Sequence, residues 1–91
     1  MALAPSSVPR LWRLARLDFD SVRQQQVLLY PEGMVKLNGS AGAIMSRCDG
    51  VRTVAEIVAD LERTYGLTGL SGDVIAFVAL ALDKRWLELR A

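Results

Sequence analysis

Residues 27–37, Val27-Leu28-Leu29-Tyr30-Pro31-Glu32-Gly33-Met34-Val35-Lys36-Leu37, contain the clearest β signal in the chain. A β-branched and aromatic run ends at Tyr30, and Pro31-Glu32-Gly33 follow at once. Proline presets φ for the first corner of a turn, and glycine accepts the positive φ that a short hairpin with a bulge needs. Met34–Leu37 then form a second extended run. The stretch therefore predicts an antiparallel hairpin.

Upstream of the hairpin the signals are weaker. Residues 11–22 mix apolar and charged positions, and they are compatible with one further strand without clean alternation. Residues 1–10 are rich in proline and serine, which predicts a loose leader or an ordered arm. We therefore expect an N-terminal arm at residues 1–10 and a single domain at residues 11–91.

Downstream, two helices carry recognisable start and stop signals. Asn38-Gly39-Ser40 can cap a short helix that Asp49-Gly50 ends, and Thr53 with Glu56 has the spacing of a capping box in a second helix that ends at Gly66. Apolar residues recur at helical spacing in both. The first stripe is Ala41, Ile44, Met45 and Cys48, and the second is Val54, Ile57, Val58, Leu61 and Tyr65.

A third helix is predicted from a Ser71 cap to about Leu87, and its middle is apolar almost all the way round. Helical spacing gives one natural inward stripe: Ile75, Val78, Ala79, Leu82 and Trp86. Val74, Phe77 and Ala81 then lie toward a neighbouring side. That side is either an exposed apolar interaction surface or is covered by the arm or the sheet, and periodicity leaves both open. The order of elements predicts an α+β fold, a three-stranded antiparallel sheet followed by three helices.

Composition narrows the function classes. The chain has 91 residues, 52% of them apolar, and a formal net charge of +1 from 11 basic and 10 acidic residues. This balance gives no reason to expect nucleic acid or an anionic membrane as a partner. The longest apolar run, Val74–Leu82, is too short for a membrane span, and the start does not resemble a signal peptide. We expect a cytosolic protein.

Catalytic and metal-binding constellations are not apparent in the sequence. There is no histidine, and the single cysteine, Cys48, lies on a helical core stripe, which predicts a buried small residue and not a reactive thiol. Asp49 beside Gly50 is typical of the end of a helix, and Asp18 and Asp20 are typical of the solvent-exposed face of a strand. We therefore predict no enzyme activity, no cofactor and no metal.

A winged-helix DNA-binding regulator is the main alternative, since strands and three helices suit that shape. Its recognition helix should be basic. Here the third helix is apolar in its centre, and acidic residues match its basic ones: Asp73, Asp83 and Glu88 against Lys84, Arg85 and Arg90. DNA binding is disfavoured. A carrier for a small quinone would need a pocket with polar groups, for which the sequence shows no constellation.

Several blocks in the right order and spacing resemble the PqqD family of pyrroloquinoline quinone (PQQ) biosynthesis, over roughly residues 9–90. They are Leu28-Leu29-Tyr30-Pro31-Glu32-Gly33, Lys36-Leu37-Asn38, Ile44 to Cys48-Asp49-Gly50, and Thr53-Val54-Ala55-Glu56-Ile57-Val58. The resemblance implies a winged helix-turn-helix-like RiPP recognition element. Such a domain is a peptide chaperone that binds the precursor peptide PqqA and presents it to the radical SAM enzyme PqqE.

The resemblance also implies where the peptide binds, as an added strand beside the third strand and against the third helix. The strand edge would comprise Met34, Val35, Lys36, Leu37 and Asn38. The helical wall would comprise Val74, Phe77, Val78 and Ala81, with Lys84 and Arg85 meeting acidic peptide residues. A Val35→Pro substitution is expected to remove a ladder donor and abolish binding. The same edge could instead pair with a second copy, which would give a homodimer that competes with the peptide.

Overall fold

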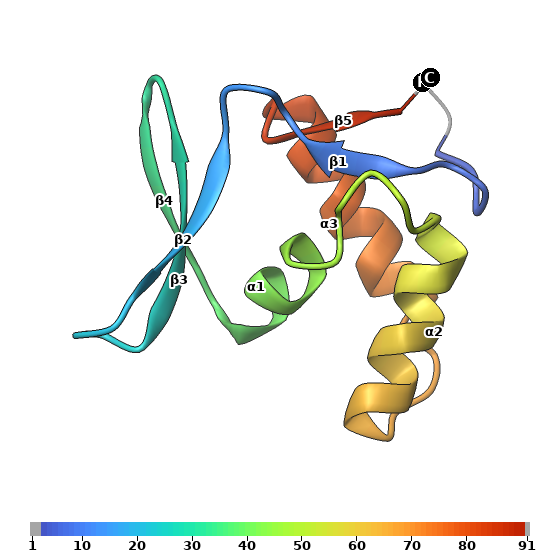
Figure 1. The fold of residues 1–91 in the computed structure, drawn as a ribbon. Coiled ribbons are helices and arrows are strands. Elements are labelled where there is room, and N and C mark those ends of the chain that lie inside the picture. The colour runs from blue at the N-terminus through green and yellow to red at the C-terminus, as the bar shows by residue number, and fades with distance from the viewer. Residues whose placement is uncertain (1–2, 91) are drawn as a thin grey trace.

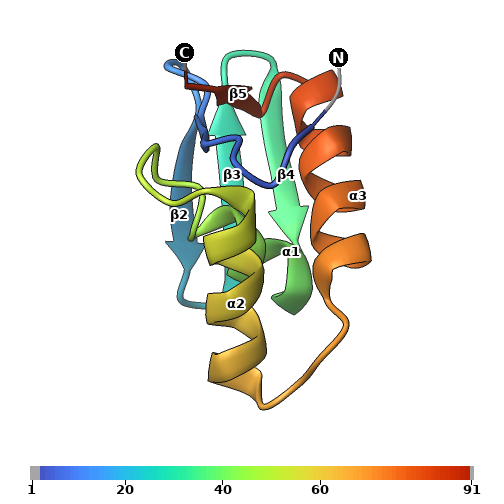
Figure 2. The ribbon, with the colours of Figure 1, turned by 90° about the vertical axis from the view of Figure 1, so that its right-hand side faces the viewer.

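The computed structural model describes residues 3–90, so the first two residues of the predicted arm and the last residue of the predicted domain lie outside it. Its elements, in chain order, are β1 (Pro9–Leu11), β2 (Arg16–Asp20), β3 (Gln25–Tyr30), β4 (Gly33–Leu37), α1 (Gly39–Met45), α2 (Val54–Tyr65), α3 (Ser71–Asp83) and β5 (Leu87–Leu89). The predicted α+β class, with a three-stranded antiparallel sheet and three helices, is confirmed. The sheet has the order β2-β3-β4, and the helices lie to one side of it (Figures 1 and 2).

The predicted hairpin is confirmed. β3 and β4 pair in antiparallel register across the two-residue turn Pro31-Glu32, and Tyr30 pairs with Gly33. The strand predicted within residues 11–22 is present as β2, whereas β1 lies almost entirely in the predicted arm and was not expected. β2 joins the hairpin, whereas β1 pairs with β5 in a second, two-stranded sheet.

The arm is tied to the domain from several directions. The backbone N–H groups of Val54 and Ala55 donate to the carbonyl oxygens of Ser7 and Pro5 at 2.9 and 3.0 Å. Two of the free N–H groups at the start of α2 are thus satisfied by the arm. The Arg90 N–H donates to the Val8 carbonyl at 2.8 Å, which extends the contact between the two ends of the described chain.

The predicted starts of the first two helices are confirmed. The Asn38 side chain accepts from the Ala41 N–H at 2.7 Å, and Thr53 and Glu56 form the complete capping box. Gly66 ends α2 in the left-handed conformation, with φ of 64°. Gly42 of α1 packs directly against the Gln26 side chain of β3, where a Cβ would collide. This absence of a side chain lets α1 approach the sheet closely.

The third helix differs from its prediction at both ends. Ser71 is its first residue and makes no capping hydrogen bond, because the cap position is Leu70. The helix stops at Asp83, not at about Leu87, because Arg85 adopts a left-handed φ of 61° and the Trp86 N–H donates back to the Ala81 carbonyl. The chain then reverses into β5. None of the helices in residues 3–90 is long and apolar enough to cross a membrane.

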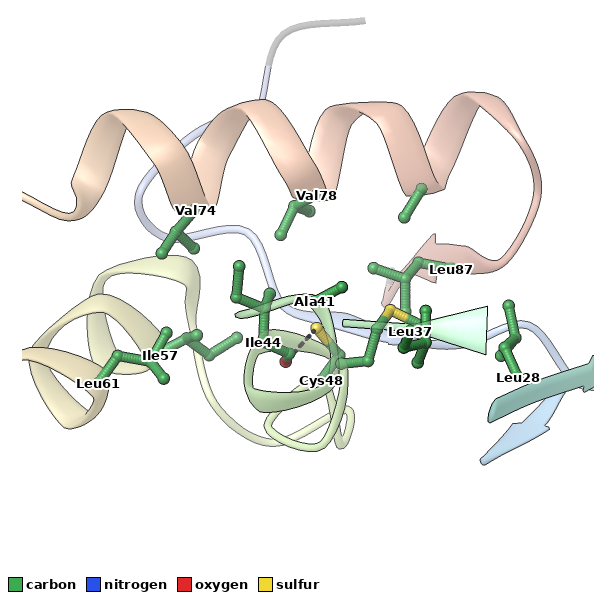
Figure 3. Packing of buried hydrophobic residues seen from close by; sticks show 12 residues of the cluster. Leu28, Leu37, Ala41, Ile44, Cys48, Ile57, Leu61, Val74, Val78 and Leu87 are labelled. Carbon is green, nitrogen blue, oxygen red and sulfur yellow. Dashed lines mark hydrogen bonds between the residues drawn. The ribbon is translucent and has the colours of Figure 1, made fainter. Parts of the chain in front are cut away.

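The predicted inward stripe of α3 is correct at Val78 but not for the stripe as a whole. Val74, Val78 and Ala81 are the buried residues, at 2%, 0% and 0% exposure, while Ala79 is exposed and Ile75 and Leu82 are half-buried. Figure 3 shows Val74 and Val78 pointing from α3 toward the side chains of α1 and α2. A helix that is apolar on all sides contains more than one apolar stripe, so helical spacing alone could not identify the stripe that is buried. The sequence left open whether the side of α3 that contains Val74 and Ala81 is exposed or buried, and in the structure it is buried.

Candidate functional site

The β4 strand forms one edge of the sheet, since β3 is its only neighbour among the described strands. The helix α3 runs alongside it in Figure 2 but packs most closely on α2 and β5. An edge strand presents a row of N–H and C=O groups without ladder partners. The sequence-predicted strand edge thus corresponds to a free edge in the structure.

The register decides which backbone groups of β4 face outward. Hydrogen-bonded and non-hydrogen-bonded pairs alternate along an antiparallel ladder, and the pair that closes a two-residue turn is of the hydrogen-bonded kind. Counted from the closing pair Tyr30–Gly33, the N–H groups of Val35 and Leu37 face β3. Those of Met34 and Lys36 face away. The Val35→Pro test was therefore aimed at the wrong residue, because it would break the hairpin itself.

The side chains of this segment divide by their surroundings. Met34 and Lys36 are exposed, while Val35 is half-buried against the core and Leu37 is buried at 3% exposure. The Asn38 side chain is occupied in capping α1. A partner strand can therefore reach the backbone of this edge, but the Leu37 side chain has almost no surface to offer.

The residues predicted on α3 do not form one surface. Val74, Val78 and Ala81 belong to the core, so a docked partner cannot reach their side chains without opening the domain. Phe77 is half-buried and retains accessible surface. Sequence reasoning missed Leu80, which is 47% exposed three residues after Phe77. Its apolar character on the flank shared with Phe77 was the available signal.

The two flanks of α3 face different parts of the molecule. Ala79 and Leu82 lie with Leu3 of the arm around a small cavity. In Figure 1, α3 lies between this arm and the three-stranded sheet. At helical spacing Phe77, Leu80 and Lys84 fall on the flank away from the arm, on the side of β4. This flank and the free edge together form the candidate site, which we call the β4–α3 surface.

Two cationic residues lie at the end of α3, beside this surface. Lys84 is the C-cap residue, and its ammonium nitrogen lies 6.0 Å from the centroid of the Trp86 ring, at the outer limit of a cation–π contact. Arg85 is exposed in the turn that follows. The structure thus brings Phe77, Lys84 and Arg85 of the predicted wall to the surface.

Groups that could support catalysis are limited in the described part of the chain. No cluster of three or more acidic, Cys or His side chains suited to a metal ion occurs in residues 3–90. Cys48 is 3% exposed, and desolvation, with a smaller contribution from Asp49, raises its pKa from 9.0 to about 12. The prediction that Cys48 is a buried small residue is confirmed.

The predicted end of the first helix at Asp49-Gly50 is wrong, because α1 ends at Met45 and Asp49 lies in the loop before α2. Its side chain accepts hydrogen bonds from the backbone N–H groups of Val51 and Arg52 at 2.9 and 3.0 Å. The hydrogen bond from the Arg52 backbone is the largest cause that lowers the pKa of the Asp49 carboxyl. The carboxylate therefore shapes the turn between α1 and α2.

Comparisons with known proteins point to one family. The family model for coenzyme PQQ synthesis protein D (PqqD) matches residues 25–87. A PqqA binding protein of Pseudomonas aeruginosa is 49% identical, with 92% of each chain covered, and one of Stutzerimonas stutzeri is 44% identical, with 93% of this chain and 94% of the relative covered.

A solved structure agrees with the sequence comparisons. The solution NMR structure of the PqqD truncation of Methylobacterium extorquens PqqCD, described as a functional, stand-alone RiPP recognition element, is 39% identical to this chain. It superposes with a TM-score of 0.81 over 96% of this chain and 95% of that one. On sequence and structure together, the chain belongs to the PqqD family of coenzyme PQQ synthesis proteins.

Proposed function

We propose that this protein is a non-catalytic, winged helix-turn-helix-like recognition domain that binds the precursor peptide PqqA and presents it to PqqE. The relatives that carry the name PqqA binding protein, and the solved recognition element, support peptide binding in PQQ biosynthesis. The role of PqqE rests on the family resemblance alone. Because such a precursor is a ribosomal product, we place the protein in the cytoplasm.

The observation that carries the proposal is the free edge of β4 beside an apolar flank of α3. Met34 and Lys36 direct backbone donors and acceptors outward, which is what an extended peptide needs to join a sheet. Phe77 and Leu80 supply apolar surface for its side chains. The ladder would give affinity with little dependence on sequence, and the flank would add selectivity. A peptide held in this way leaves its remaining residues free for an enzyme.

The charges near the β4–α3 surface suit a peptide better than DNA. The exposed residues of α3 include Asp73 and Asp83, and those of α2 include Glu56, so neither helix presents the basic surface that a polyanion requires. Lys84 and Arg85 can meet acidic peptide residues at one end of this surface. Pairing of two β4 edges would give a homodimer that blocks the peptide, so we expect dimer and complex to exclude each other.

The decisive test removes a backbone N–H group of β4 that faces away from β3. Lys36→Pro removes the backbone N–H at the centre of the free edge but leaves the β3 ladder intact. We expect it to weaken the binding of synthetic PqqA by about tenfold or more, since a lost hydrogen bond and a clash with the ring act together. Calorimetric titration at low and high salt gives the affinity and separates ladder pairing from charge attraction.

Two control variants isolate the cause. Lys36→Ala removes the charge but keeps the N–H, and it should bind nearly as well as the wild type. Phe19→Pro places proline on the opposite edge, at an N–H that donates to the Asp18 side chain at 2.8 Å and not to β3. It should leave binding unchanged. Full affinity of a folded Lys36→Pro variant would exclude strand addition at β4.

A further inference from the structure

A pocket of about 420 Å³ lies where α1 begins, α2 ends and α3 begins. Ile44, Leu61 and Val74 line its floor, and Figure 3 shows these three side chains close together at one end of the core. At its mouth, Tyr65 and Leu67 are 56% and 52% exposed, which is high for large apolar side chains. The pocket is therefore an apolar recess open to water.

The wall formed by the α2–α3 loop is held in place by Glu62. The Leu67 N–H donates to the Glu62 carbonyl at 2.9 Å, and the Leu70 N–H donates to a Glu62 carboxylate oxygen at 3.0 Å. Gly66 and Gly69 take the positive φ values that the turns on this path require. The recess is thus part of the folded domain before any ligand arrives, which lowers the ordering cost of binding.

This pocket adjoins the β4–α3 surface. Gly39 and Ser40, on its rim, directly follow Asn38 at the end of the strand edge. Asp73 and Val74 lie one helical turn before Phe77 on α3. An extended chain advances about 3.3 Å per residue, so a strand paired with Lys36 reaches the pocket within a few residues beyond the ladder.

Asp73 is the charged residue of the pocket lining, and its charge would favour one type of peptide residue next to the side chain that fills the pocket. Asp73 is exposed and forms no ion pair with the basic side chains of residues 3–90. A basic residue of the ligand, adjacent to the one that fills the recess, would therefore meet a complementary charge. The β4–α3 surface would then select charged peptide residues at both ends, with the anionic Asp73 at one and the cationic Lys84 at the other.

We propose that this pocket binds one aromatic or long aliphatic side chain of the precursor peptide, from the segment that continues past Asn38, with a basic peptide residue facing Asp73. This inference rests on the proposed function and deepens it, because it adds a second point of selection to the ladder. The ladder accepts most sequences, whereas an apolar recess of fixed shape accepts few side chains.

The experiment compares Leu67→Lys with the wild type in calorimetric titrations of full-length PqqA and of peptides shortened from each end. A lysine at the mouth places a charge where the apolar side chain would be buried. We expect Leu67→Lys to bind the full-length peptide about tenfold or more weakly. One of the shortened peptides should bind the wild type with the same reduced affinity and should not respond to the substitution.

Matched variants complete the design. Leu67→Met keeps the apolar mouth and should retain affinity, and Val51→Lys adds the same charge at another exposed apolar residue, 73% exposed and outside the pocket lining. A folded Leu67→Lys variant with wild-type affinity overturns the pocket inference alone, and so does an equal loss in Val51→Lys. A wild type that binds none of the peptides overturns the proposed function, and the pocket inference with it.

Discussion

The buried thiol of Cys48 should make the domain lose stability at alkaline pH. Burial raises its pKa from 9.0 to about 12, so the folded protein keeps the proton at pH values where the unfolded chain releases it. The unfolded state then binds fewer protons than the native state, and the free energy of unfolding falls as pH rises above the unfolded value. The stabilising contribution is thus complete below about pH 8 and is lost between the two pKa values.

The magnitude follows from linkage. With an unfolded pKa of 9.0, the loss is about 0.4 kcal/mol at about pH 9 and about 1.4 kcal/mol at about pH 10. The assay is urea unfolding of the wild type and of Cys48→Ala at a series of pH values. The two proteins differ only at residue 48, so the difference between their two curves isolates the thiol.

Labelling gives an independent reading of the same prediction. The thiolate is the reactive form, and a pKa of about 12 in place of 9.0 reduces its population about a thousandfold near neutral pH. A thiol reagent should therefore modify native Cys48 only through opening of the domain. If the free energies of unfolding of the wild type and Cys48→Ala stay parallel up to about pH 10, or if the native thiol reacts as fast as in urea, the burial argument is wrong.

Two further predictions concern α2. Thr53→Ala should cost about 1 kcal/mol in urea unfolding because it removes half of the capping box, whereas Ser71→Ala should cost little because Ser71 makes no capping bond; equal losses would contradict this assignment of caps. The side-chain hydrogen bond from Arg47 is the largest cause that lowers the pKa of Asp60 below 3.8, so this contribution to stability is present above that pH and is lost as pH falls through the folded value. The stability difference between wild type and Asp60→Asn should shrink in acid, and a constant difference from neutral to acidic pH would exclude the linkage.

The parts of the fold that sequence predicted well are those with local signals. The hairpin and α2 are specified by residues a few positions apart, such as Pro31 with Gly33 and Thr53 with Glu56. The β1–β5 pair was missed because it joins segments near both ends of the chain, where Arg10 and Glu88 are 78 positions apart. Two strands of three residues leave no periodic pattern to detect.

The candidate site was predictable in part for the same reason. Its strand edge coincides with a recognisable motif, and only the structure could show that Met34 and Lys36, not Val35, direct N–H groups outward. On α3 the uniform apolar composition hid which stripe is buried, so Val74 was assigned to a surface that it does not share. The pocket beside Leu67 depends on three helix ends meeting, which no single segment encodes.

The pairing of β1 with β5 has a consequence for the order in which a nascent chain can fold. β1 is synthesised early, yet its partner is the final strand of the described chain, so it waits unpaired until nearly all of that chain has emerged. The hairpin and α1 need only neighbouring residues and pay a small loop-closure cost. A chain leaving the ribosome can therefore complete the β4 edge before β1 and β5 pair with each other.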